Sequence, residues 1–203
     1  MPKIVDAVAR RAEIVDAVFR IIAVDGLERA SLREVADEAG LAVGSVRHYF
    51  AGSDELLRFS FAAVVDRILA RLTAALPDMA ASETGSDARH NAVLTLLGEF
   101  LPLDEERAVD ACVWMAFKNA ARIRPFLAAE ADRSHREVAA VVGQVITALV
   151  RDDGDGQQSL TIEAERLLAT LDGLCMHALL QPEWMTAQMC HDVLDRHLRS
   201  LAA

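Results

Sequence analysis

The chain lacks any apolar run long enough to cross a bilayer, although hydrophobic residues make up 53% of its 203 positions. Its apolar residues stand in short clusters that charged side chains interrupt. The N-terminus also lacks the continuous apolar region and the small-residue cleavage site of a secretory signal. We therefore expect a cytoplasmic protein.

Cysteine is scarce, and the three cysteines, Cys112, Cys175 and Cys190, are widely spaced. An odd number at such spacing is not a disulfide framework, so we interpret them as buried thiols in a reducing compartment. The chain also lacks zinc-finger cysteine pairs, a phosphate-binding glycine loop and a nucleophile elbow. The aspartate-rich turn at 152–156 lacks the spacing and closing glutamate of a calcium loop. No metal and no cofactor are expected.

An enzyme is the main alternative from another class, because Asp172, Cys175, His177, Cys190 and His191 could be drawn together as a thiol dyad or a metal site. Neighbours one or two apart on a helix point to different faces, which separates Cys175 from His177 and Cys190 from His191. We therefore predict no catalytic residue and no enzymatic activity. A metal assay on the purified protein distinguishes the two hypotheses.

Strand patterns are lacking too, because the apolar spacing is helical almost everywhere and no segment alternates over the length of a strand. The sequence therefore predicts an all-α protein. Glycines separate the first helices and prolines mark most of the later boundaries. The expected helices cover residues 4–25, 31–39, 43–50, 53–76, 88–101, 104–122, 125–151, 160–180 and 186–201.

Positive charge is in short supply, with 21 Lys and Arg against 31 Asp and Glu and a net charge of -10. This balance argues against a polyanionic partner, and it is the one feature that supports a helical interaction module that never contacts DNA. Residues 1–60 carry 8 basic and 10 acidic side chains, whereas residues 61–203 carry 13 and 21. Most of the negative charge thus lies outside the first sixty residues, and a DNA role depends on local placement.

The first fifty residues have the pattern of three short amphipathic helices. Ile14, Val18 and Ile22 form an apolar stripe on the first. Ser31 and Glu34 have the spacing of a capping box, in which Ser31 accepts from the Glu34 amide and Glu34 reaches back, so the second helix begins at Ser31. A turn at Ala39 and Gly40 leads into the third.

The third helix, residues 43–50, has one apolar and one polar side. Val46 and Phe50 stand at i, i+4 spacing as inward anchors. On the other side, small residues allow close approach to DNA, and longer polar residues offer donors to phosphates and base edges. By chemistry alone, His48 and Tyr49 could equally be ordinary surface residues of a small helical domain.

From about Arg10 to Leu57 the sequence resembles the DNA-binding domain of the tetracycline-repressor (TetR) family. The matching elements are, in order, Ile14-Val15-Asp16-Ala17, Gly26, Ser31, Val35-Ala36, Ala39-Gly40-Leu41, Gly44-Ser45-Val46, His48-Tyr49-Phe50 and Leu56-Leu57. The resemblance implies a helix-turn-helix domain at residues 1–52 that binds double-stranded operator DNA. It assigns DNA contacts to Ser31, Arg33, Val43, Gly44, Ser45, Arg47, His48 and Tyr49.

Two positions depart from the family pattern. Arg47 stands where an aromatic residue is usual, and Ser53 stands where a lysine usually opens the fourth helix. Arg47 either restores the lost cationic contact or reads a guanine through a bidentate pair. The sequence does not choose between these roles.

Across residues 61–203 the resemblance to the family is weaker. The tail there looks similar to the betaine-choline repressor (BetI)-like branch in Leu167-Leu168-Ala169-Thr170-Leu171-Asp172-Gly173-Leu174, Leu179-Leu180 and Pro182. The resemblance assigns residues 53–203 to a second domain. It implies a helical ligand-binding and dimerisation domain, a small-molecule effector of unknown identity and, as the family's common mode, repression that the effector relieves. The expected ligand-binding residues are Phe100, Trp114, Phe117, Arg122, Phe126, Met176 and His177, with Asp110 and Glu99 as further polar candidates.

The last two helices carry apolar stripes that are typical of a helix bundle. A homodimer is expected because two recognition helices must reach successive major grooves. The alternative is that the stripes face only the core of their own chain. The expected interface residues are Leu167, Leu171, Leu174 and Ala178 on one helix, and Cys190, Leu194, His197 and Leu201 on the other.

Overall fold

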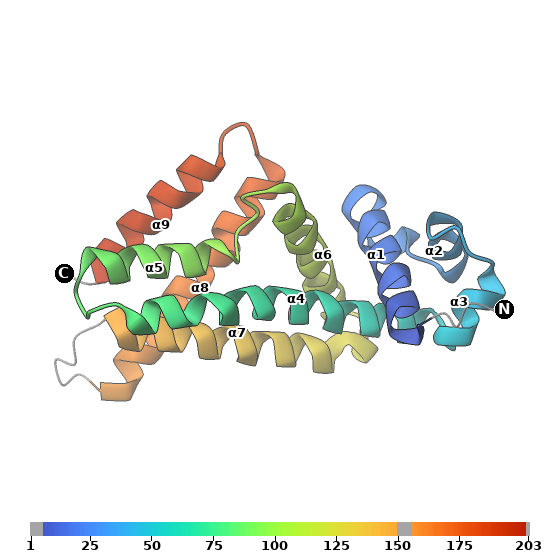
Figure 1. Ribbon diagram of the computed structural model, residues 1–203, viewed down its shortest axis with the longest axis horizontal. Helices are drawn as coiled ribbons and strands as arrows, with labels where there is room; N and C mark the ends of the chain where they lie inside the picture. The colour runs from blue at the N-terminus through green and yellow to red at the C-terminus, as the bar shows by residue number, and fades with distance from the viewer. Residues whose placement is uncertain (1–5, 150–155, 202–203) are drawn as a thin grey trace. The chain divides into compact units, whose positions relative to one another are not determined.

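The fold is all-α, as predicted. A computed structural model describes residues 6–149 and 156–201, and these residues form α-helices and short 3-10 turns without a strand (Figure 1). The first half contains α1 (Ala7–Asp25), a 3-10 turn η1 (Leu27–Arg29), α2 (Leu32–Glu38), α3 (Val43–Tyr49) and α4 (Ser53–Ala81). The second half contains α5 (Asp87–Gly98), α6 (Glu105–Ala121), η2 (Pro125–Leu127), α7 (Ala128–Leu149), α8 (Gly156–Leu180) and α9 (Ala187–Leu201).

Helix α4 is longer than the sequence suggests, because it does not end before Pro77 but continues to Ala81. A proline inside a helix removes one backbone hydrogen bond and crowds the preceding turn. Packing and capping offset that cost: Met79 in the last turn is buried, and the Arg89 guanidinium donates from Nη2 to the Ser82 carbonyl at 2.9 Å. Tertiary contacts therefore override the local signal.

Other boundaries shift by smaller amounts. Helix α4 begins at Ser53, as predicted, whereas α5 ends at Gly98, three residues before its expected end. Helix α8 begins at Gly156, one turn earlier than expected. The rest of the aspartate-rich turn, like the expected helix start at residue 4, lies outside the described residues.

The chain divides into two compact units. The first comprises the described part of residues 1–66 together with 112–132, and the second comprises 67–111 and the described part of 133–203. Helices α4, α6 and α7 each have one segment in the first unit and one in the second. The boundary predicted between residues 52 and 53 separates DNA binding from effector binding and dimerisation. The division into compact units does not test it, so it stays a prediction.

The core of the first unit forms where the apolar faces of its helices meet. Ile14, Val18 and Val46 are fully buried, as are the rings of Phe61 and Phe117, which stack with their centroids 5.0 Å apart. These contacts hold the first helices in a fixed arrangement, and that arrangement positions the polar face of α3.

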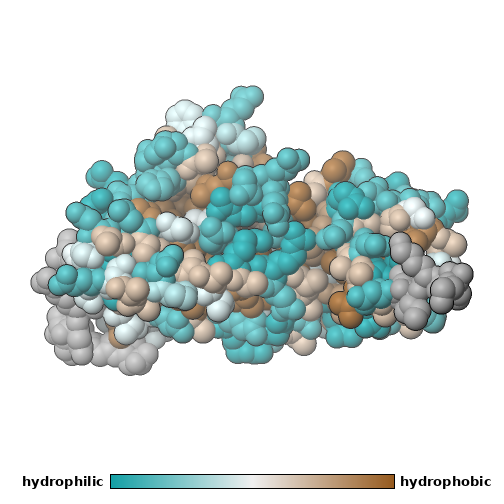
Figure 2. Space-filling model, viewed as in Figure 1, coloured by the Kyte–Doolittle hydropathy of each residue, from teal (hydrophilic) through white to brown (hydrophobic). Residues whose placement is uncertain are grey.

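In the second unit, α9 packs against both α5 and α8. Its core contains apolar residues from α5, α7, α8 and α9, including Leu97, Ile146, Leu171 and Leu198. On the face of the molecule shown in Figure 2, hydrophilic residues predominate and hydrophobic residues form separate small patches.

Candidate DNA-binding surface and regulatory half

Helix α2 begins with one half of the predicted capping box. The Ser31 Oγ accepts a hydrogen bond from the Glu34 amide at 3.2 Å, as expected. In place of the second capping-box bond, from the Ser31 amide to the Glu34 carboxylate, the Ser31 amide donates to the Arg29 carbonyl at 2.7 Å. The Glu34 carboxylate lies 3.5 Å from the Arg29 guanidinium. The nearby cation draws the carboxylate away, and the serine cap alone fixes the start of α2.

The turn between α2 and α3 depends on Gly40, whose φ of 66° lies in the left-handed region that only glycine adopts without strain. After it, the Leu41 amide donates to the Ala36 carbonyl at 2.8 Å, which satisfies the end of α2. Val46 and Phe50 are buried as predicted. Burial of these two residues turns the opposite side of α3 outward.

The predicted DNA-contacting residues lie on the surface of the first unit. Six of them are exposed, namely Ser31, Arg33, Gly44, Ser45, Arg47 and His48, and two are half-buried, namely Val43 and Tyr49. The His48 and Tyr49 rings meet edge to face with centroids 5.2 Å apart, which restrains both side chains. These positions are accessible to a duplex, while contact with DNA stays a prediction.

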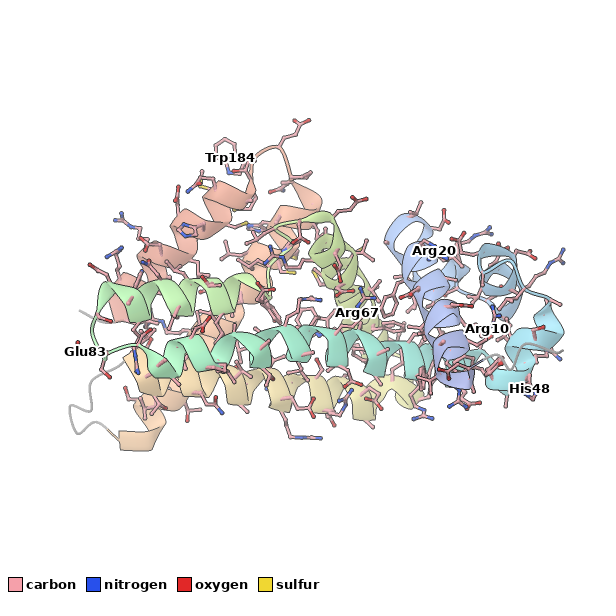
Figure 3. The ribbon with its side chains drawn as sticks, in the orientation of Figure 1. Arg10, Arg20, His48, Arg67, Glu83 and Trp184 are labelled. Carbon is pink, nitrogen blue, oxygen red and sulfur yellow. The ribbon has the colours of Figure 1, made fainter. Side chains whose placement is uncertain are left out.

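A hollow of about 410 Å³ lies beside α3, and one of its walls comes from α1. Its lining residues are Arg10, Leu41, Gly44, Ser45, His48 and Tyr49. Sequence reasoning missed Arg10, because it lies more than thirty positions before α3 and no local pattern connects the two. Figure 3 labels Arg10 and His48 in this part of the molecule.

Four of the predicted ligand-binding residues belong to the first unit. Trp114 and Phe117 on α6 are buried, Phe126 is half-buried and Arg122 is exposed. The Lys118 Nζ lies 4.1 Å from the centre of the Trp114 ring, and Phe117 is occupied by its stack on Phe61. These two aromatic side chains therefore already serve the packing of their own unit.

The other three belong to the second unit. Phe100 is buried, whereas Met176 and His177 are exposed on α8. Exposed side chains do not line an enclosed cavity, so Met176 and His177 fit a surface role better. The assignment of the whole set to an effector stays a prediction.

A charged cluster joins α4 to α6 within the second unit. Asp110 on α6 is fully buried, and its Oδ2 accepts from Arg71 Nη1 at 2.7 Å while its Oδ1 lies 3.4 Å from Arg67 Nε. Figure 3 shows Arg67 on α4 facing α6. Glu106 and Glu99 extend the cluster, at 3.2 Å from Arg67 and 3.9 Å from Arg71. The buried carboxylate is thus paired with two guanidinium groups, which offset the cost of removing it from water.

Most of the predicted dimer-interface residues are buried within the single chain. Leu167, Leu171, Leu174, Cys190 and Leu194 are buried within their own chain, while Ala178, His197 and Leu201 are half-buried. Burial of these five residues favours the alternative that the stripes face the core of their own chain, where α9 packs against α5 and α8. Which residues form the subunit interface stays a prediction. A residue that is already buried in the single chain has no surface left for a partner to cover.

Other apolar side chains of α8, α9 and their connection are exposed instead. Trp184 is 75% exposed and Leu180 is 70% exposed, and Met176, Met189 and Val193 are exposed to smaller extents. Figure 3 shows Trp184 in the connection between α8 and α9, pointing away from both helices. These five residues are called the outer apolar set below.

The cysteines behave as structural thiols. Cys175 and Cys190 are buried, Cys112 is half-buried, and none of the three forms a disulfide. Burial raises the pKa of Cys112 and Cys190, which suppresses the reactive thiolate. Across residues 6–149 and 156–201, no group of three or more His, Cys, Asp or Glu is arranged to hold a metal ion. Within the same ranges, no helix is both long and apolar enough to cross a membrane.

A helix-turn-helix with an accessible recognition face, followed by a helical second half, defines a DNA-binding transcriptional regulator. Residues 14–58 match the family of bacterial regulatory proteins, tetR family, and residues 89–203 match the C-terminal domain of BetI-type transcriptional repressors. The chain therefore belongs to the TetR family, which confirms the predicted family and its role in transcription.

Individual relatives agree with this assignment along nearly the whole chain. The HTH-type transcriptional regulator PksA of Bacillus subtilis (strain 168) is 36% identical over 203 residues, which cover 99% of this chain and 94% of PksA. The crystal structure of a transcriptional regulator from Rhodococcus sp. Rha1 has a TM-score of 0.79 at 31% identity, covering 94% of this chain and 95% of that one. The multidrug binding protein EbrR complexed with ethidium has a TM-score of 0.64 at 28% identity, covering 93% and 98%.

Proposed function

We propose that this regulator is a homodimeric repressor that a small-molecule effector releases from its operator. The observation that carries the proposal is the orientation of α3, which buries Val46 and leaves Ser45 and Arg47 exposed beside an exposed Gly44. Small residues permit close approach to a groove and the guanidinium offers donors to base edges. In this proposal residues 1–52 bind DNA and residues 53–203 bind the effector and the second subunit. The proposed role requires no catalytic residue, and the cytoplasm stays the predicted location.

A small-molecule effector is supported by kinship with EbrR, a multidrug binding protein crystallised with ethidium. The proposal does not extend to ethidium itself, since ligand pockets differ between relatives of such low identity. Trp114 and Phe117, the large apolar groups of the first unit, are proposed to lie near the effector, and apolar walls with few polar groups suit drug-sized molecules.

A homodimer is supported by the outer apolar set, whose large side chains remain in water on the single chain. A two-fold dimer places two recognition helices about 34–36 Å apart, which matches successive major grooves. We propose that the outer apolar set, in place of the buried leucine stripe, forms the centre of the subunit interface.

Helix α4 is proposed to transmit the effector signal, because it begins four residues after α3 and continues into the second unit. An effector that prefers a tilted α4 weakens DNA binding by its coupling energy, typically about 1–3 kcal/mol or roughly 5–150-fold. Operator DNA must then weaken effector binding by the same factor.

The decisive experiment starts with selection of bound fragments from genomic DNA, which yields the operator and its neighbouring genes. Thermal-shift screening then supplies an effector, which is titrated with and without operator duplex. Reciprocal weakening supports the switch, and equal effector affinity in both titrations contradicts it. Absence of any salt-dependent shift with genomic fragments would instead favour the interaction module that does not contact DNA.

Arg47→Ala tests the recognition helix directly. If Arg47 reads a base, the variant loses about 1–3 kcal/mol of binding free energy on operators that carry the preferred base. A uniform loss across operator variants identifies a phosphate contact. Unchanged affinity on all of them removes Arg47 from the interface.

A further inference from the structure

The hollow between α1 and α3 gathers hydrogen-bond donors from two helices that are distant in sequence. Arg10 comes from α1, and Ser45, His48 and Tyr49 come from α3. Arginine, serine, histidine and tyrosine side chains all donate to phosphate oxygens. The hollow, of about 410 Å³, opens on the same side of α3 as the exposed Gly44.

Arg10 is held in place without being fully neutralised. Its side chain is 27% exposed, and its Nη1 lies 2.5 Å from the Glu13 carboxylate one turn further along α1. This ion pair is partly exposed, so it contributes little free energy and competes weakly with a second anion. Partial burial also restricts the rotamers of Arg10, which lowers the entropy cost of placing its guanidinium against a ligand.

We propose that Arg10 binds a backbone phosphate of the operator in this hollow, as a positioning residue at the edge of the recognition helix. A guanidinium matches the geometry of a phosphate and pairs with two of its oxygens. Because α1 flanks α3, the Arg10 side chain meets the duplex at the wall of the groove, where the phosphates lie. Helix α3 then faces the base edges. Such a contact fixes the register of α3 and carries no sequence preference.

This inference rests on the proposed binding of operator DNA, and its test separates the two. Arg10→Gln removes the charge and keeps the side chain polar, and Arg10→Lys keeps the charge. Arg20→Gln is the matched control, since Arg20 is an exposed arginine of the same helix that is likewise paired to a glutamate, Glu38, at 2.5 Å. Ten positions along α1 place Arg20 about 15 Å away from Arg10.

Each variant is titrated with the selected operator duplex and with a scrambled duplex over a range of salt concentrations. Losing one phosphate contact reduces the slope of log affinity against log salt by about 0.9, which corresponds to about fivefold weaker binding at about 0.15 M salt. Arg10→Gln is expected to show this loss on both duplexes, Arg10→Lys is expected to keep the wild-type slope, and Arg20→Gln is expected to match wild type. Thermal melting of all variants checks that the fold is retained.

Equal slopes and affinities for Arg10→Gln and Arg20→Gln would overturn the proposal. A loss confined to the operator duplex, with an unchanged slope, would also overturn it and make Arg10 a base reader. If the wild-type chain binds neither duplex, the proposed function fails, and that result is distinct from a wild-type chain that binds while Arg10→Gln has no effect.

Discussion

Single glycines have different physical roles in and around the recognition helix. Gly40 adopts φ 66°, where any other residue is strained, so its role is conformational. Gly44 lies inside α3, and a Cβ added there meets no atom within 4 Å. Nothing in the free protein therefore requires glycine at position 44, and we predict that close approach to DNA is what requires it.

Gly44→Ala is expected to separate stability from DNA binding. Alanine is favoured over glycine inside a helix by roughly 0.5–1 kcal/mol, so the free energy of unfolding rises or is unchanged. Operator affinity falls, because the new methyl group meets the duplex. Urea denaturation and operator titration measure the two effects.

The control for this variant is Gly143→Ala in α7, where an added Cβ likewise meets no atom within 4 Å. This change has the same helical benefit and leaves operator affinity unaltered. If Gly44→Ala binds operator as tightly as Gly143→Ala, α3 does not approach the duplex at this position.

Asp195 on α9 gives the protein an acid-sensitive contact. Two hydrogen bonds lower the pKa of this carboxyl to about 2. The larger effect comes from Arg199 Nε at 2.9 Å, and the smaller comes from the contact of His90 Nε2 with Asp195 Oδ1 at 2.6 Å. A carboxyl whose pKa is lowered by folding stabilises the fold above its unfolded value near 3.9, and that contribution disappears as the pH falls from about 4 to about 2.

Asp195→Asn is therefore expected to flatten the pH dependence of stability within this acidic window. The free energy of unfolding, measured by denaturant titration from about pH 5 to about pH 2, should fall less steeply for the variant than for wild type. Identical curves would show that the pair with Arg199 and His90 does not persist in solution.

At the scale of the helices, the α4–α6 pairing depends on a buried charge and not on apolar contact alone. Asp110 is buried against Arg67 and Arg71, which come from successive turns of α4. Two cations share one carboxylate, so removal of Asp110 leaves both without this partner.

Asp110→Ala is expected to lower the free energy of unfolding by about 1.5–3 kcal/mol, the contribution of a hydrogen bond to a charged group, because Arg67 and Arg71 remain partly exposed to water. Glu106→Ala is the control, because Glu106 pairs with the same Arg67 at 3.2 Å but is 72% exposed. An exposed pair contributes about 0–1 kcal/mol. Equal losses for the two variants in urea denaturation would mean that burial adds nothing to the Asp110 pair.

At the scale of the whole molecule, subunit assembly is proposed to depend on the outer apolar set. Leu180→Glu combined with Trp184→Glu places charges at its two most exposed members, and exposed tryptophan is a frequent interface hot spot. We expect monomers by sedimentation, with operator binding weakened because the half-sites are no longer engaged together.

Val24→Glu is the control for surface charge, since Val24 is 83% exposed on α1 and outside the proposed interface. It is expected to leave the dimer intact. A dimer that survives the double change would place the interface elsewhere. Arginine at Leu171 and Leu194, in contrast, is expected to unfold the chain, because both side chains are buried in its own core.

Much of the fold could be predicted because its signals are local. Helical spacing, the Ser31 cap and the glycine at position 40 each act within one or two turns, and the structure confirms all three. The inward anchors Val46 and Phe50 followed from i, i+4 spacing, and the outward face of α3 followed from them. The family resemblance rests on the same short-range patterns.

Tertiary structure decided what depends on distant partners. Apolar periodicity identified a buried stripe on α8 and α9, but only packing showed that its own chain covers it, because a leucine buries equally well against α5 or against a second subunit. The helix past Pro77 required Met79 to be buried and Arg89 to reach the Ser82 carbonyl. Arg10 lies beside α3 only because the first unit folds, so no spacing rule in the sequence connects it to His48.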